Sequence, residues 1–293
     1  MNLGPLLIFV LFLVSMGNVD AICEDMTVLS GPPKGDMPIP DSVMKYAIGR
    51  ELSVVWLNEL CGLTCRVRDA DKVTFIKWAP SSSEIDLNVE RTKLRWAMSY
   101  TPVPKVVEFG EDTEGSWLVT EGIDAENAVS DRWKREPALA VSAIGRGLRA
   151  MHDALPIASC PFSWSTEDRV SKARGRIIRS ETHPSKWHQE FQDLSMEAAL
   201  IELDFLPSVD QLVVCHGDAC APNTLINTNG EWVGHVDLER LGVSDRWADI
   251  AIAAWSTQWN YGPGWENLLY DSYGIDPDLE KIRFYRLLWD LGE

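Results

Sequence analysis

The stretch from residue 212 to residue 249 constrains the possible folds of this chain more than any other part of its sequence. An apolar run over residues 212–214 leads into a His-Gly-Asp motif at 216–218. A short apolar run that ends near a glycine is typical of a buried strand that delivers a polar loop. Asn223 follows in the same loop, and a second strand-like run ends at Asp237. We therefore expect two carboxylates and one carboxamide at neighbouring strand ends.

These polar side chains suit a magnesium phosphate site, because Mg²⁺ takes few protein oxygens and shares its remaining positions with phosphates and water. The spacing from His216 through Asp218 to Asn223 is that of protein kinase catalytic loops. In those loops the Asp accepts the proton of the attacking hydroxyl, and the Asn holds a metal ion. Asp237 then takes the place of the second metal ligand. An isolated His-x-Asp is commonly only a turn, whereas the combined spacing favours phosphoryl transfer with Asp218 as the catalytic residue.

The segments CHGDACAPNTLI (215–226) and HVDLERLGVSDRWADIA (235–251) resemble the signature of the aminoglycoside phosphotransferases. They are most similar to the 3′-phosphotransferases of the kanamycin and neomycin type, and the resemblance runs from about Leu52 to residues 287–291. It implies a kinase that transfers phosphate from ATP, with Mg²⁺, to an aminoglycoside hydroxyl. The 3′-hydroxyl is the expected acceptor, and antibiotic resistance the expected consequence.

The resemblance also implies an α+β, two-lobed, protein-kinase-like fold. We expect an apolar N-terminal segment and irregular lead-in over residues 1–40. A nucleotide-binding lobe with an antiparallel sheet, one helix and the hinge should cover residues 41–122. A mostly helical catalytic and substrate lobe should cover residues 123–293.

The apolar run from Leu6 to Met16 is too short to span a membrane easily and fits the core of a signal peptide better. No Lys or Arg precedes it, however, so the targeting pattern is incomplete. We expect translation to start at or near Met26, with an N-terminal anchor as the alternative. The enzyme is expected in the cytoplasm, where ATP is available, with no membrane contact apart from this segment.

Lys77 ends an apolar strand-like run, a position where a Lys is usually only an edge residue. The resemblance implies that Lys77 instead orients the ATP phosphates and pairs with a Glu of the next helix. Apolar spacing predicts that helix over residues 84–99, and Glu90, in its middle, is the expected partner. Glu84 and Asp86 compete for this role, although they also suit the first turn of a helix.

Gly62 and Thr64 lie in a predicted turn over residues 61–67, between strand-like runs at 54–56 and 73–76. The resemblance implies that this turn covers the ATP phosphates and contacts them through backbone N–H groups and hydroxyls. The turn has a single glycine, so a plain hairpin explains its sequence equally well.

The acceptor is expected to be a cationic small molecule. The chain has 27 basic and 44 acidic residues and a formal net charge of −17. This balance argues against nucleic acid binding and suits a cationic ligand, although a soluble acidic protein explains it as well. The resemblance implies that Arg240 lies near the acceptor pocket and that Asp290 binds an acceptor ammonium group. A purely structural salt bridge is the alternative for Arg240.

Two departures from the family pattern leave the acceptor open. Glu239 stands where the family commonly has Gly, and Gln258, Trp259 and Asn260 replace an acidic pair. The alternative is a kinase of another small hydroxylated acceptor, such as streptomycin at its 3″-hydroxyl, a macrolide or a metabolite. A catalytically inactive, kinase-like binding protein is a further alternative. It predicts the loss of catalytic residues, and all of the expected ones are present.

Two further residues have expected structural roles. The resemblance implies that Asp249, in the first turn of a helix, braces the backbone of the catalytic loop. His152 lies at the end of an apolar helical stripe, where it is expected to interact with the helix dipole.

Overall fold

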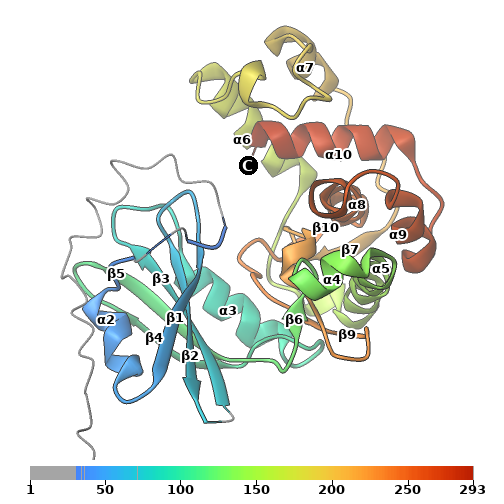
Figure 1. Ribbon diagram of the computed structural model, residues 1–293. Helices are drawn as coiled ribbons and strands as arrows, with labels where there is room; N and C mark the ends of the chain where they lie inside the picture. Colours follow the sequence, from blue (N-terminus) through green and yellow to red (C-terminus); the bar gives the residue numbers. More distant parts are fainter. Residues whose placement is uncertain (1–30, 34, 36, 71, 293) are drawn as a thin grey trace, which may run out of the picture. The chain divides into compact units, whose positions relative to one another are not determined.

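The computed structural model describes residues 31–33, 35, 37–70 and 72–292 (Figure 1). The predicted start site and the apolar N-terminal run lie outside these residues. Contacts divide the chain into two compact units. The first runs to Leu87 and includes Glu108–Thr120, and the second comprises Asn88–Val107 and the chain from Glu121 onward. Within the described part of the chain, no helix is both long and apolar enough to cross a membrane.

The first unit is built on a five-stranded sheet with the order β1-β2-β3-β5-β4, in which β1, β2 and β3 pair antiparallel. Its core includes Trp78 and Trp117 from the sheet and Val43 from the short helix α2. The expected N-terminal antiparallel sheet is thus confirmed. The elements are α2 (Asp41–Met44), β1 (Glu51–Leu57), β2 (Leu63–Asp69), β3 (Lys72–Pro80), β4 (Val106–Glu111) and β5 (Gly115–Glu121).

The predicted turn over residues 61–67 is wrong, because β2 occupies most of it. In β2, Leu63, Cys65 and Val67 are buried and alternate with more exposed residues. This period of two, with polar residues at the alternate positions, is the signal of a half-buried strand, and the turn prediction overlooked it. The connection between β1 and β2 is therefore only residues 58–62.

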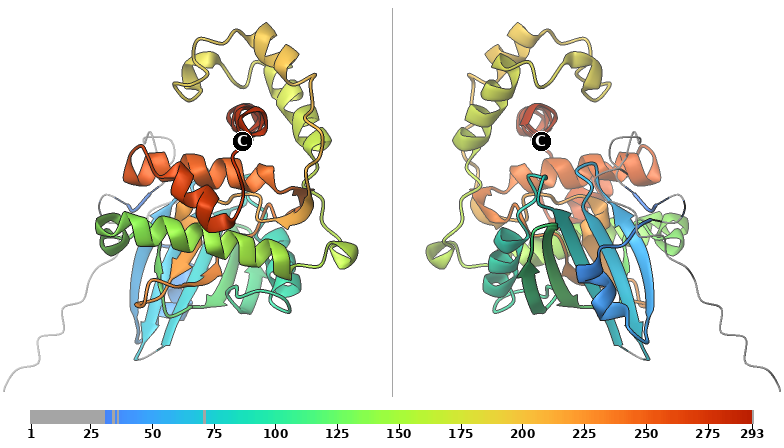
Figure 2. Two further views of the ribbon diagram at one scale, coloured as in Figure 1. Left: turned by 90° about the vertical axis from the view of Figure 1, so that its right-hand side faces the viewer. Right: turned by 90° about the vertical axis from the view of Figure 1, so that its left-hand side faces the viewer.

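The second unit is mostly helical, as expected, and packs around α8. Helix α8 is buried from Trp247 to Thr257, which is typical of a helix that is apolar all round. It packs against α5, α9 and α10. Figure 2 shows α6 and α7 arching around α10. The helices are α3 (Leu87–Ala97), α4 (Asp131–Arg135), α5 (Pro137–Ala154), α6 (Thr166–Ile178), α7 (Met196–Glu202), α8 (Trp247–Tyr261), α9 (Glu266–Tyr273) and α10 (Leu279–Gly292).

The polar loops of the predicted site follow strands that belong to two small sheets of the second unit. Strand β7 pairs antiparallel with β10, and β8 lies between β6 and β9. The strands are β6 (Glu126–Asn127), β7 (Leu212–Cys215), β8 (Thr224–Ile226), β9 (Trp232–His235) and β10 (Gly242–Asp245).

Helix α3 begins later than the expected helix over residues 84–99. The chain still turns at Ser83, whose hydroxyl donates to the Pro80 carbonyl and accepts from the Ile85 N–H. Glu84 and Asp86 therefore precede the helix, and Glu90 lies in its first turn rather than in its middle.

The close contact between α5 and α9 depends on Gly145. A Cβ atom at this position would lie 2.7 Å from the Leu269 carbonyl oxygen and 2.8 Å from Ser272 Cβ. Gly175, within α6, is different, because a Cβ there would approach only the flexible end of Arg179.

We predict that Gly145→Ala lowers the free energy of unfolding in urea by about 1–3 kcal/mol, because overpacking displaces α9. Gly175→Ala should instead raise it by about 0.5–1 kcal/mol through helix propensity alone. Equal, favourable effects of the two substitutions would show that the α5–α9 contact is looser than described.

Candidate functional site

The catalytic loop begins where β7 ends, and its geometry requires a glycine. His216 is fully buried, and Gly217 has a φ of 86°, in the left-handed region. A Cβ atom at Gly217 would lie 2.3 Å from the Arg240 carbonyl oxygen. The loop therefore passes directly against the backbone of the Asp237–Arg240 segment, which only glycine permits at this point.

The carboxylate of Asp249 fixes the backbone of this loop through two hydrogen bonds. Its Oδ2 accepts the His216 N–H at 2.6 Å, and its Oδ1 accepts the Gly217 N–H at 3.0 Å. Burial alone would raise the pKa of Asp249, but the hydrogen bond from His152, with the backbone donors, lowers it overall. Asp249 is therefore an ionised, hydrogen-bonded brace, in the position the sequence suggested.

His152 belongs to this brace, and it lies in the last turn of α5, the helix end at which it was expected. Its Nε2 lies 2.9 Å from Asp249 Oδ2, and its Nδ1 lies 2.9 Å from Tyr273 Oη. The side chain is buried, and both of its ring nitrogens are engaged by side chains of other helices. Its partners come from α8 and α9, so no local pattern in the sequence identified them.

His216 connects the loop to the neighbouring strand. Its Nδ1 accepts the Asp218 N–H at 3.2 Å, so Nε2 is the nitrogen that donates to the Val236 carbonyl, at 2.9 Å. Both ring nitrogens are thus engaged by backbone groups. His216 shapes the loop and has no nitrogen left for proton transfer to a substrate.

Asp218 presents a carboxylate oxygen that lacks a partner. Its Oδ1 is buried and accepts no hydrogen bond within the described residues. An unsatisfied buried polar atom costs about 1–3 kcal/mol, so such atoms commonly mark a ligand contact. The nearby Cys220 is no nucleophile, because burial, and then the charge of Asp218, raise the pKa of its thiol well above the usual value.

Asn223 and Asp237 are brought to the same place by backbone hydrogen bonds. The Asn223 side-chain N–H₂ donates to the Asp218 carbonyl at 3.0 Å, so its Oδ1 is left to accept or to ligate. The Val236 N–H donates to the Asn223 carbonyl at 3.0 Å. Asp237 is the next residue after Val236, so this hydrogen bond brings the Asp237 backbone near Asn223. Asp237 has a φ of 67°, a strained conformation that is common at functional sites. One amide oxygen and one carboxylate are suitable protein ligands for a Mg²⁺ ion that also binds phosphate oxygens.

In the first unit, the predicted phosphate-contacting residues are neighbours. Thr64 and Lys77 lie directly opposite each other on β2 and β3. The Gly62 N–H donates to Asn58 Oδ1 at 2.7 Å, and the Leu60 N–H donates to the same oxygen at 3.0 Å. Sequence reasoning missed Asn58, although Asn is a common turn residue for this reason.

The Lys77–Glu90 pair stays a prediction, because the two residues belong to different units. Glu90 is only 3% exposed. A buried carboxylate requires a partner, which agrees with a role in an ion pair.

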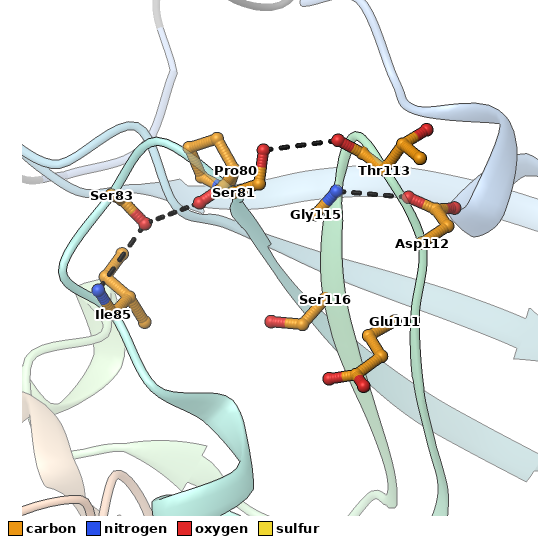
Figure 3. Close-up of a pocket in the computed structure, with 9 residues that line it drawn as sticks. All are labelled: Pro80, Ser81, Ser83, Ile85, Glu111, Asp112, Thr113, Gly115 and Ser116. Carbon is orange, nitrogen blue, oxygen red and sulfur yellow. Dashed lines mark hydrogen bonds between the residues drawn. The ribbon is translucent and has the colours of Figure 1, made fainter.

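A cavity of about 470 Å³ lies in the first unit, between the β3–α3 connection and the β4–β5 turn (Figure 3). Its polar groups mostly close the turn: Asp112 accepts the Gly115 N–H, and the Ser81 hydroxyl donates to the Thr113 carbonyl. None of the predicted nucleotide contacts lines it. The lining residues are Pro80, Ser81, Ser83, Ile85, Glu111, Asp112, Thr113, Gly115 and Ser116.

On the acceptor side, Arg240 and Asp290 are both held by neighbours. The Arg240 guanidinium lies over the rings of Trp164 and Trp289, at 5.9 Å and 5.4 Å from their centroids. Asp290 Oδ2 accepts the His188 N–H at 2.8 Å. Burial raises the pKa of Asp290 to about 6, so this carboxyl group titrates just below neutral pH.

The residues that replace the family's acidic pair mostly turn inward. Gln258 donates to Glu266 at 2.6 Å, and Asn260 donates to the Ser256 carbonyl at 2.8 Å. Trp259 alone of the three is exposed, at 44%. Acidic residues between 165 and 205 could also bind a cationic acceptor, but several of them form ion pairs with Arg side chains. These pairs are Glu181 with Arg179, Glu202 with Arg283 and Asp204 with Arg174.

Comparisons with known proteins agree with this arrangement. The family model described as "Phosphotransferase enzyme family" matches residues 63–285. An aminoglycoside 3′-phosphotransferase of Streptomyces fradiae is 36% identical over 220 residues, covering 72% of this chain and 81% of the relative. The crystal structure of an aminoglycoside-3′-phosphotransferase of type VIII is 32% identical, with a TM-score of 0.71, covering 83% of this chain and 94% of that one.

A second solved structure is the Streptomyces rimosus aminoglycoside phosphotransferase APH(3″)-Id in complex with ADP and streptomycin. It is 26% identical, with a TM-score of 0.63, and the match covers 78% of this chain and 90% of that one. These likenesses confirm the expected kinase-like, two-lobed architecture. With its catalytic loop, its paired metal-ligand candidates and these matches, the chain belongs to the phosphotransferase enzyme family.

Proposed function

We propose that this protein transfers the γ-phosphate of ATP to a hydroxyl of an aminoglycoside antibiotic, at the 3′ position, and so confers resistance. The observation that supports this most is the buried, unpartnered Oδ1 of Asp218, beside the Asn223 and Asp237 segments. Such an oxygen is suited to accept a hydrogen bond from an acceptor hydroxyl. The dependence on ATP places the reaction in the cytoplasm.

In this proposal the nucleotide is bound by the residues that the family resemblance implies. Gly62 and Thr64 contact the phosphates, and Lys77 orients them while it pairs with Glu90. Asn223 Oδ1 and the Asp237 carboxylate hold Mg²⁺. When bound, this ion neutralises the negative charge of the phosphates.

Asp218 positions the acceptor. Its Oδ1 accepts the hydroxyl hydrogen and aligns the hydroxyl oxygen with the γ-phosphorus. The new O–P bond forms as the bond to the ADP oxygen breaks, and the hydroxyl proton passes to Asp218 late in the transfer. His216 takes no proton, because both of its nitrogens are engaged by the backbone.

Asp290 binds the acceptor's positive charge, and Arg240, whose guanidinium lies over Trp164 and Trp289, lies near the acceptor. The similarity to 3′-phosphotransferases supports the 3′-hydroxyl. The second candidate is streptomycin at its 3″-hydroxyl. It is supported by the similarity to the streptomycin complex and by Trp259, which presents an indole where the family commonly has acids.

We predict that the protein consumes ATP with kanamycin and neomycin but not with tobramycin, which lacks the 3′-hydroxyl. The measurement is a coupled assay of ADP release with each drug, with streptomycin, with a macrolide and with no acceptor. Turnover with streptomycin alone would replace the 3′ proposal by the 3″ alternative. Turnover with none of them, while ATP still binds, would contradict an antibiotic acceptor.

We also predict that the KM for the aminoglycoside rises roughly tenfold between pH 7.5 and pH 5, while the KM for ATP changes little. Because the pKa of Asp290 is about 6, its carboxyl group loses its charge over this range, and with it the attraction for the ammonium group. Asp290→Asn should have a high KM throughout and a flat profile. An unchanged slope in Asp290→Asn would exclude Asp290 as the titrating group.

A further inference from the structure

A chain of hydrogen bonds leads from α9 to the catalytic loop, and its first member has no assigned role. Tyr273 Oη lies 2.9 Å from His152 Nδ1, and His152 Nε2 lies 2.9 Å from Asp249 Oδ2. The same Asp249 oxygen accepts the His216 N–H. Tyr273, His152 and Asp249 are all buried, so water does not compete for these contacts.

The direction of each hydrogen bond follows from the protonation of the two ends. Asp249 is an ionised acceptor, because its pKa is lowered overall despite its burial, so His152 Nε2 must carry a proton. Burial raises the pKa of the Tyr273 phenol, so the phenol keeps its proton. With Nε2–H directed at Asp249, Nδ1 is the nitrogen that lies against the Tyr273 hydroxyl, which donates to it.

We propose that Tyr273 is a positioning residue for phosphoryl transfer: it holds His152 in the tautomer and orientation that direct Nε2–H at Asp249, and thereby holds the catalytic loop. This inference rests on the proposed function. Tyr273 lies at the end of α9, and it acts through two other side chains rather than on the substrate.

The structure offers a matched control on the same helix. Tyr270 is also buried, packs against Trp247 with ring centroids 6.3 Å apart, and makes no hydrogen bond through Oη among the described residues. Removing its hydroxyl deletes no interaction. A general effect of losing a phenol oxygen from α9 would therefore appear in both variants, and an effect of the hydrogen-bonded chain in only one.

The position of Tyr273 depends on the close approach of α5 and α9. Gly145 lies on α5 seven residues before His152, and a Cβ there would be 3.1 Å from the Tyr273 N. The absence of a side chain at Gly145 lets the two helices approach closely beside the Tyr273–His152 contact.

The test compares Tyr273→Phe with Tyr270→Phe in the full chain, with whichever acceptor the wild-type protein phosphorylates. We expect kcat of Tyr273→Phe to fall about tenfold, because His152 Nδ1 is left without its donor and the loop is held less well. The KM values for ATP and acceptor should stay within about twofold, because no substrate contact is lost. Tyr270→Phe should keep the wild-type kcat. An unchanged kcat in Tyr273→Phe, or an equal loss in Tyr270→Phe, would overturn the inference.

A spectroscopic measurement separates positioning from packing. In uniformly ¹⁵N-labelled protein, His152 should show the Nε2–H tautomer, with its signals identified by their loss in His152→Gln. Tyr273→Phe should shift the His152 Nδ1 signal and the Gly217 amide signal, and Tyr270→Phe should shift neither. Circular dichroism checks that each variant is folded.

A double variant tests the route of the effect. In a His152→Gln background, Tyr273→Phe should reduce kcat by less than about twofold, because Tyr273 acts through His152. A full tenfold loss there would contradict this route. If the wild-type protein phosphorylates no acceptor, the proposed function fails, and the Gly217 and His152 signals alone then decide whether Tyr273 holds the loop.

Discussion

The buried carboxylate of Asp249 is the interaction on which the site depends. It accepts two consecutive backbone N–H groups of the catalytic loop and the Nε2–H of His152. A buried ionised group is costly unless it is surrounded by donors, and here the donors are the very groups that must be held in place. Through its hydrogen bond to Asp249, the Gly217 backbone, which is in the left-handed conformation, is attached to the buried helix α8.

Further hydrogen bonds connect the loop held by Asp249 to the neighbouring strands. His216 links the loop to the end of β9, and the Asn223 side chain links the Asp218 carbonyl to the start of β8. The side chains of His216 and Asn223 thus bond to backbone groups on either side of Asp218, so the loop is held in place by the protein itself. Such preorganisation suits phosphoryl transfer, in which positioning and charge neutralisation supply most of the rate.

The sequence predicted the parts of this arrangement that depend on local spacing. Asp218, Asn223 and Asp237 could be placed at neighbouring strand ends because apolar runs and glycines mark where strands stop. The strand β2 was missed although its apolar and polar residues alternate, because the segment that begins at Cys61 and Gly62 was read as one long turn. The roles of His152, Tyr273 and Asn58 were missed for a different reason. Each of these roles depends on a partner that tertiary structure or a specific turn brings close. Such a partner produces no periodic pattern of apolar residues in the sequence.

Asp218→Asn shows whether this scaffold presents Asp218 to an acceptor hydroxyl. The substitution keeps the shape of the side chain but removes its capacity to take a proton. We expect kcat for phosphate transfer to fall by about a thousandfold while ATP affinity, measured by calorimetry, stays within about twofold. A folded Asp218→Asn protein with kcat close to that of the wild type would contradict the account.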